Sequence, residues 1–430
     1  MDELGIAIEF YEPSDDKSTF DGRLYMDESG RSFFEFEGSL IDAFRTFPVI
    51  YATSTEDEKY TFINCMHKQS KAGICRFSIR ELYKGDHISD VTEKDCREIE
   101  GRMTGLTNWI NHPRIKPEIT FSTGDDSKVI MKGMFKRQFD IRADVTLELC
   151  EFCGEQYSRN ETILQNLSYF KIYSEKLHGR LEMYKDATAL LKFLSLFTFG
   201  VPRLTDLNFT YSNDRTVELL TVKRRSHPDD NEALLKFDKL EPYLPETLQV
   251  LYTTRDKFIS VLKLFIESII NHTPEISFLN ITSAFEVFHK NFLEASSAAL
   301  LPSLYSELNS AGLVNRTTCK WDQILRYLHL FKLTEKFDFQ KQDLSNPLST
   351  LDIMRESRNY YTHYTPTRKK VWTPNELIYA NRTLRQVLKA ALLQELKIPM
   401  DLSNKLLNHR AAYIHQDFES NKFSLNYVEK

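Results

Sequence analysis

The sequence has few cysteines, no long apolar run and no basic leader. Six cysteines lie at irregular spacings in 430 residues, which is unlike a disulfide framework and favours a reducing, cytoplasmic compartment. The longest apolar stretch, residues 187–201, contains Lys192 and is too short to span a bilayer, so we expect no membrane partner. The chain starts Met-Asp-Glu-Leu-Gly, with acids where a signal peptide needs bases, and we expect no cleaved leader.

Several common catalytic motifs are also missing. The sequence has no Gly-x4-Gly-Lys-Ser/Thr loop for nucleoside triphosphates, no His-Glu-x2-His and no Gly-x-Ser-x-Gly. Cys150 and Cys153 form one Cys-x2-Cys pair, but a structural zinc ion needs two more ligands at comparable spacing. We therefore expect neither a metal nor another cofactor.

Charge is distributed unevenly along the chain. The formal net charge is −5, which argues against a protein that coats nucleic acid over its whole surface. Between residues 355 and 385, however, seven basic residues face two acidic ones, a local balance of about +5. Arg368, Lys369 and Lys370 lie in this stretch. The pattern predicts a focused phosphate-binding site, although the triplet alone could equally be a solvated loop.

The residue patterns predict an α+β protein with more than one domain. Alternating or β-rich runs, such as 145–150, 34–37 and 60–65, fill the first half and indicate a sandwich-like sheet structure. Long helical patterns follow, at 246–271, 276–294, 320–332, 347–364 and 374–396. We expect a β-rich domain over residues 1–225, a linker over 226–245 and an all-α bundle over 246–430.

One hexapeptide, Arg358-Asn-Tyr-Tyr-Thr-His363, stands out within the helical half. Its helix should begin at Pro347, with Asn346 as N-cap, and end before Pro366. Arg355, Asn359 and His363 follow at i, i+4 and i+8 and should form one polar stripe that Arg358 can reach from its flank. The helix dipole favours an imidazolium in this last turn. Together these side chains could transfer protons and bind a phosphate group.

At this point the residues resemble a known family. The pattern Arg-polar-x3-His on a late helix of an all-α bundle resembles the HEPN domain of metal-independent ribonucleases. An earlier helix carries Glu286, which could orient Arg358 or His363 or could be a solvated residue. A β-rich first half with Gly105-Leu-Thr-Asn-Trp109 ahead of such a domain is similar to ApeA-type anti-phage proteins.

The resemblance implies an endoribonuclease of abortive infection that leaves 2′,3′-cyclic phosphate ends. It implies catalysis by Arg358, Asn359 and His363, with Glu286 and Arg355 in support and Arg368, Lys369 and Lys370 on the RNA. The partners would be RNA, for example tRNA or another cellular RNA, a second copy of the chain in a homodimer or larger assembly, and a phage-derived trigger. The alternative is an inactive HEPN-like scaffold that dimerises and carries a sensing β domain.

A second copy of the spacing, Arg410-x4-His415, has Ala411 in the polar position. It is the weaker candidate because alanine cannot order the neighbouring side chains by hydrogen bonding.

Overall fold

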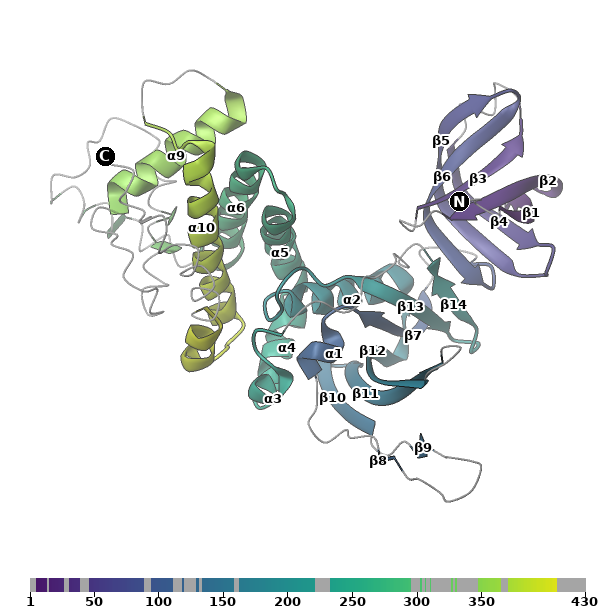
Figure 1. The fold of residues 1–430 in the computed structure, drawn as a ribbon, viewed down its shortest axis with the longest axis horizontal. Coiled ribbons are helices and arrows are strands. Elements are labelled where there is room, and N and C mark those ends of the chain that lie inside the picture. The colour runs from purple at the N-terminus through teal and green to yellow at the C-terminus, as the bar shows by residue number, and fades with distance from the viewer. Residues whose placement is uncertain are drawn as a thin grey trace. The chain divides into compact units, whose positions relative to one another are not determined.

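The structure is a computed structural model, and its chain trace is drawn in Figure 1. It describes residues 5–13, 15–26, 31–38, 46–88, 94–110, 118–119, 129–130, 134–157, 162–220, 233–294, 347–364 and 370–407, with isolated helical positions between 302 and 330. These residues divide into two compact units, one of residues 1–191 with 202–232 and one of residues 192–201 with 233–430. The predicted α+β class, with a β-rich first part and a helical last part, is confirmed.

The first six strands of the β-rich unit form a closed ring of antiparallel pairs. They are β1 (Ile6–Glu12), β2 (Asp15–Met26), β3 (Ser32–Glu37), β4 (Thr46–Ser54), β5 (Lys59–Lys71) and β6 (Ile74–Gly85). The strand order is β6-β3-β2-β1-β4-β5, and β5 pairs back onto β6. The β-rich prediction is confirmed, and its sandwich-like form is in these strands a closed ring. Alternation in sequence shows that one face of a strand is buried, and this holds for a closed ring as well as for two stacked sheets.

Phenylalanine side chains fill the interior of the ring. Phe34, Phe62 and Phe77 are fully buried, and the Phe34 ring lies 5.3 Å from Phe77 and 5.4 Å from Phe62 between centroids. Phe34 and Phe36 alternate with Glu35, so the period of two that was visible in the sequence does place apolar residues inside.

Strand β6 also begins the second part of the sheet. Its first half, residues 74–79, pairs with β3, and its end, residues 83–85, pairs with β14. Beyond β14 the strand order is β13, β7, β12, β11 and β10. The bounds are β7 (Lys94–Met103), β10 (Met134–Arg142), β11 (Val145–Tyr157), β12 (Thr162–Gly179), β13 (Leu204–Tyr211) and β14 (Thr216–Leu219). A separate short pair joins β8 (Glu118–Ile119) to β9 (Val129–Ile130).

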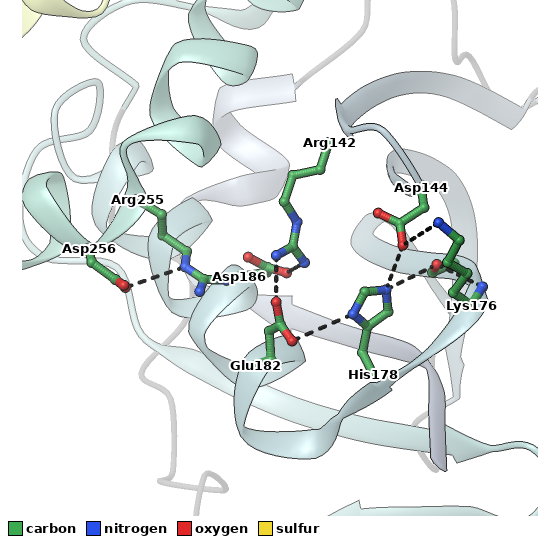
Figure 2. Close-up of polar contacts among 9 residues, drawn as sticks. Arg142, Asp144, Lys176, His178, Glu182, Asp186, Arg255 and Asp256 are labelled. Carbon is green, nitrogen blue, oxygen red and sulfur yellow. Dashed lines mark hydrogen bonds and ion pairs between the residues drawn. The ribbon is translucent and has the colours of Figure 1, made fainter. Parts of the chain in front are cut away.

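A polar network fixes the β10–β11 turn to helix α2 (Arg180–Leu194) (Figure 2). Arg142, at the end of β10, donates to Glu182 at 2.7 Å and to the fully buried Asp186 at 2.5 Å. His178 lies between two carboxylates, with Nε2 at 3.3 Å from Asp144 and Nδ1 at 3.6 Å from Glu182. Burial alone would raise the pKa of Glu182, but the hydrogen bond and charge of Arg142 outweigh it and lower that pKa.

The segment Gly105-Leu-Thr-Asn-Trp109 forms the start of a short helix, α1 (Leu106–Ile110). Gly105 has a φ of 83°, a conformation that favours glycine, and Trp109 is buried at 1% exposure against the β-rich unit. The segment is therefore a packed element of the fold.

The helical unit is built from α3 (Phe237–Leu240), α4 (Leu244–Thr253), α5 (Arg255–Ile270), α6 (Pro274–Phe288), α9 (Pro347–His363) and α10 (Pro374–Glu395). The single helix predicted over 246–271 is divided at Thr254, whose ψ of 24° leaves the α region. Within the predicted linker, Leu234 donates its N–H to the Phe197 carbonyl, so residues 233 onward are already packed in this unit. In Figure 1 the helix α6 runs between α5 and α10, in agreement with the contacts among them.

None of the helices in the described part of the chain is long and apolar enough to cross a membrane.

Two histidines are buried together inside the helical unit. His289 begins a π-helical turn, η3 (His289–Leu293), directly after α6, and His329 lies among the helical positions near 330. Their rings are 5.7 Å apart, and both side chains are less than 10% exposed. Burial, with the charge of Arg326 and the proximity of His329 in addition, lowers the pKa of His289 to about 4. Burial also lowers the pKa of His329.

These shifts predict that the helical unit loses stability in mild acid. The pKa of His289 is lower in the folded state than the unfolded value of 6.5. Below pH 6.5 the unfolded chain therefore binds a proton that the folded chain does not, and the free energy of unfolding falls as the pH is lowered from 6.5 toward 4. We expect the free energy of unfolding to drop by about 1–2 kcal/mol between about pH 7.5 and about pH 5. Denaturant unfolding at both pH values measures it.

His289→Gln removes the titrating ring and should reduce this drop, whereas His272→Gln, at an exposed position, should leave it unchanged. Equal pH dependence in wild type and His289→Gln would contradict the assignment.

Candidate active site

The hexapeptide lies at the end of α9, as its flanking prolines predicted. The helix runs from Pro347 to His363, while Asn346 and Pro366 lie outside the described residues. Tyr364 follows with a φ of 49°, the left-handed conformation that often ends helices but is uncommon for a bulky residue. Its N–H still donates to the Tyr360 carbonyl. The chain therefore turns away directly after the imidazole, and His363 stays exposed at the helix end.

A set of hydrogen bonds fastens α9 to the segment before α10. The Trp372 N–H donates to Ser357 Oγ at 2.8 Å, and Tyr361 Oη donates to the Trp372 carbonyl at 2.7 Å. The Trp372 indole packs edge-on against Phe278 of α6, with 5.7 Å between ring centroids. Burial raises the pKa of Tyr361, in keeping with a neutral phenol that donates. The hexapeptide is thus presented by a helix whose buried side is fixed.

Arg358 is fixed by a carboxylate from α6. Its Nη2 donates to Glu286 Oε2 at 2.7 Å, and Tyr327 Oη donates to Glu286 Oε1 at 3.2 Å. The side chains of Arg358 and Glu286 are 25% and 28% exposed, so the guanidinium is anchored on one side and reaches solvent on the other. Of the two roles that the sequence left open for Glu286, the structure shows contact with Arg358.

Arg355 does not lie on the exposed polar stripe that the sequence predicted. It is buried at 4% exposure, and its Nη2 contacts Asp352 at 2.7 Å and also Glu356. The expectation that it adds a second guanidinium to the surface patch is wrong. An i, i+4 spacing fixes only the helix face, and here that part of the face is covered by the rest of the unit.

Asn359 and His363 remain on one side of α9. Four positions separate them, so they share a helix face; Asn359 is half-buried and His363 is exposed. Arg358 and His363 are five positions apart, which places them about 140° apart around the helix axis. The guanidinium is held toward α6 while the imidazole projects from the end of the helix. One copy of the chain therefore offers one imidazole and one anchored cation, on different sides of the end of α9.

The basic stretch is less uniform than its net charge suggested. Lys370 is exposed, whereas Arg368, Lys369 and the second motif copy, Arg410 to His415, lie outside the described residues. Arg385 is engaged within the helical unit, where it donates to Ser277 Oγ at 2.6 Å and to the Ser268 carbonyl. A local charge count does not distinguish surface cations from those that bind other helices.

Neither the contact of Tyr327 with Glu286 nor the buried pair of histidines could be predicted from the sequence. Tyr327 lies 41 positions from Glu286, and no local pattern links residues so far apart. No group of three or more His, Cys, Asp or Glu side chains within the described ranges is arranged to hold a metal ion. Cys150 is a free, buried thiol that donates to Glu148.

Comparison with known protein families divides the chain into two matched regions. Residues 7–279 match the ApeA N-terminal domain 1, and residues 279–402 match the Apea-like HEPN domain. The second region contains Glu286, Tyr327 and the hexapeptide, while the first contains the β-rich unit from residue 7 onward and helices α3 to α5. Neither the search of curated proteins nor the search of solved structures found a significant match.

HEPN domains are in general ribonucleases that dimerise and act on RNA. Because the first family model alone covers more than half of the residues, and the second adds the domain that carries the hexapeptide, the chain belongs to the ApeA family of HEPN proteins.

Proposed function

We propose that this ApeA protein is an endoribonuclease of anti-phage defence that acts by attack of the RNA 2′-OH. The observation that carries the proposal is the anchored Arg358, held by Glu286 at 2.7 Å, near the end of the same helix that carries Asn359 and the exposed His363. An inactive scaffold does not require an arginine fixed in this way. The set is intact in this chain, which favours the enzyme over the dimerising scaffold.

The chemistry needs few groups because RNA contains its own nucleophile. The 2′-oxygen bonds to phosphorus, the bond from phosphorus to the 5′-oxygen breaks, and the products are a 2′,3′-cyclic phosphate and a 5′-OH. One group must take the 2′ proton and another must protonate the 5′-oxygen; positioned transfer of this kind contributes roughly 10²–10⁴-fold. His363 would transfer a proton, Arg358 would bind the charged phosphate and Asn359 would order one of them.

The site would be completed by a second copy of the chain. Two proton transfers are best served by two imidazoles, and one motif provides one. The exposure of His363 at the helix end leaves it accessible to a partner. We infer a homodimer in which two α9 helices face each other, with the β-rich region restraining the nuclease until a phage-derived trigger is present.

The direct test incubates the purified protein with total cellular RNA in EDTA and analyses the fragment ends. Fragments with 2′,3′-cyclic phosphate ends are expected, since every group named above belongs to the protein or the RNA. Intact RNA under all conditions, including extracts of phage-infected cells as a source of trigger, would favour the scaffold.

Arg358→Ala and His363→Ala should each reduce cleavage by at least roughly 10²-fold, because each removes a group that acts on the reacting phosphate. Both side chains reach solvent, so cooperative unfolding should be retained. His272→Ala, also at an exposed histidine, is the matched control and should cleave normally. If His363→Ala cleaved RNA at the normal rate and His415→Ala did not cleave it, the catalytic histidine would be the one in the second copy of the motif.

Replacing Arg368, Lys369 and Lys370 together by glutamine should weaken RNA binding and flatten its salt dependence. Loss of three phosphate contacts at roughly 0.7 each reduces the slope of log affinity against log salt by about two. Cleavage at saturating RNA should fall far less than in His363→Ala, because these residues would hold backbone phosphates away from the reacting one. Binding titrations at several salt concentrations measure this.

Glutamine at Lys236, Lys239 and Lys257, three exposed lysines of the same unit, makes the same charge change and should leave the slope intact. An unchanged slope in the first triple variant would show that the basic segment is a solvated loop.

A further inference from the structure

The hydroxyl group of Tyr327 touches the candidate site. The side chain is 1% exposed, its ring packs edge-on against Phe285 with 6.1 Å between centroids, and its Oη lies 3.2 Å from Glu286 Oε1. The other oxygen of the same carboxylate accepts from Arg358 at 2.7 Å. A buried phenol, a carboxylate and a guanidinium are therefore connected in series.

The pair of Arg358 and Glu286 is not rigid by itself. Both side chains are about a quarter exposed, and ion pairs at such positions contribute little to rigidity because water competes for both charges. A carboxylate bound at one oxygen can still rotate about its terminal bond, and the plane of the guanidinium follows it. A donor at the second oxygen stops this rotation, and a donor that is itself packed in the core stops it best.

The phenol also affects charge. Its O–H takes part of the negative charge of Glu286 without adding a positive charge of its own, so Glu286 neutralises Arg358 less completely. The guanidinium then remains more attractive to a phosphate on its solvent side. A phenylalanine at this position would keep the packing and lose both effects.

We propose that Tyr327 is a positioning residue of this site, which acts on Arg358 through Glu286. The inference rests on the proposed ribonuclease function and goes beyond it, since it extends the site to a side chain that would not touch RNA. Tyr327 thereby contributes to the orientation of a cation on α9.

The first test compares Tyr327→Phe with Tyr83→Phe. Each variant deletes the hydroxyl of a fully buried tyrosine that donates to a glutamate, to Glu286 in the first variant and to Glu81 of the β-rich unit in the second. Both should unfold slightly more easily. Only Tyr327→Phe should lower kcat for RNA cleavage, by about tenfold with a small change in KM, the effect expected from loss of one hydrogen bond to a charged group.

A double-variant comparison separates positioning from general damage. If Tyr327 acts through Glu286, Tyr327→Phe should have no further effect on kcat in the Glu286→Gln background. An equal tenfold loss in that background, or full activity of Tyr327→Phe alone, would overturn the inference.

A third measurement does not depend on cleavage. The Nε–Hε resonance of Arg358, assigned by its absence in Arg358→Lys, should shift and broaden in Tyr327→Phe and stay in place in Tyr83→Phe. An unchanged resonance in Tyr327→Phe would refute the link even in a fully active enzyme. Failure of the wild type to cleave any RNA would instead refute the proposed function, and the resonance would still decide whether Tyr327 orders Arg358.

Discussion

The contact between Glu286 and Arg358 joins the two helices on which the candidate site depends. Glu286 lies on α6, which also packs against α5 and α10, and Arg358 lies on α9. Their 2.7 Å ion pair, with Tyr327 on the same carboxylate, restrains a guanidinium that would otherwise sample solvent. The proposed proton transfer by His363 requires a phosphate that is bound at a fixed position.

Other contacts around α9 also hold this helix in place. Ser357, Tyr361 and Trp372 exchange hydrogen bonds on the buried side of the helix, and the buried Arg355 contacts Asp352 and Glu356. Hydrogen bonds between buried groups resist rearrangement, because breaking one of them leaves a partner unpaired. The helix is held at its middle while its last turn, with His363 and Tyr364, reaches solvent. An exposed end on a fixed helix suits a site that a second copy would complete.

The β-rich unit has a different organisation. Strand β6 belongs to the ring through β3 and β5 and to the remaining sheet through β14. One continuous strand therefore links a phenylalanine-filled ring to the sheet that bears α2 and the Arg142 network. A ligand that altered the ring would act on β6 directly, which gives a sensing role for this unit a physical route.

Much of this protein could be read from local sequence. The change from period-two to helical patterns predicted the β-rich and helical parts, and Pro347 and Pro366 predicted where α9 begins and ends. Asn359 and His363 share a helix face because four positions separate them. The hexapeptide and Gly105 to Trp109 were enough to suggest the family. These features depend on neighbours within about ten residues, where backbone geometry dominates.

How those elements contact one another depends on packing between distant parts of the chain. Arg355 has the same spacing as Asn359 and His363, yet it is buried, because exposure depends on what packs against the face. Closure of the ring depends on β5 pairing with β6, and Tyr327 meets Glu286 across 41 positions of sequence. Local sequence identifies the side chains that could perform the chemistry. The packing of distant helices determined which of them are anchored, because a long-range contact leaves no periodic pattern in the chain.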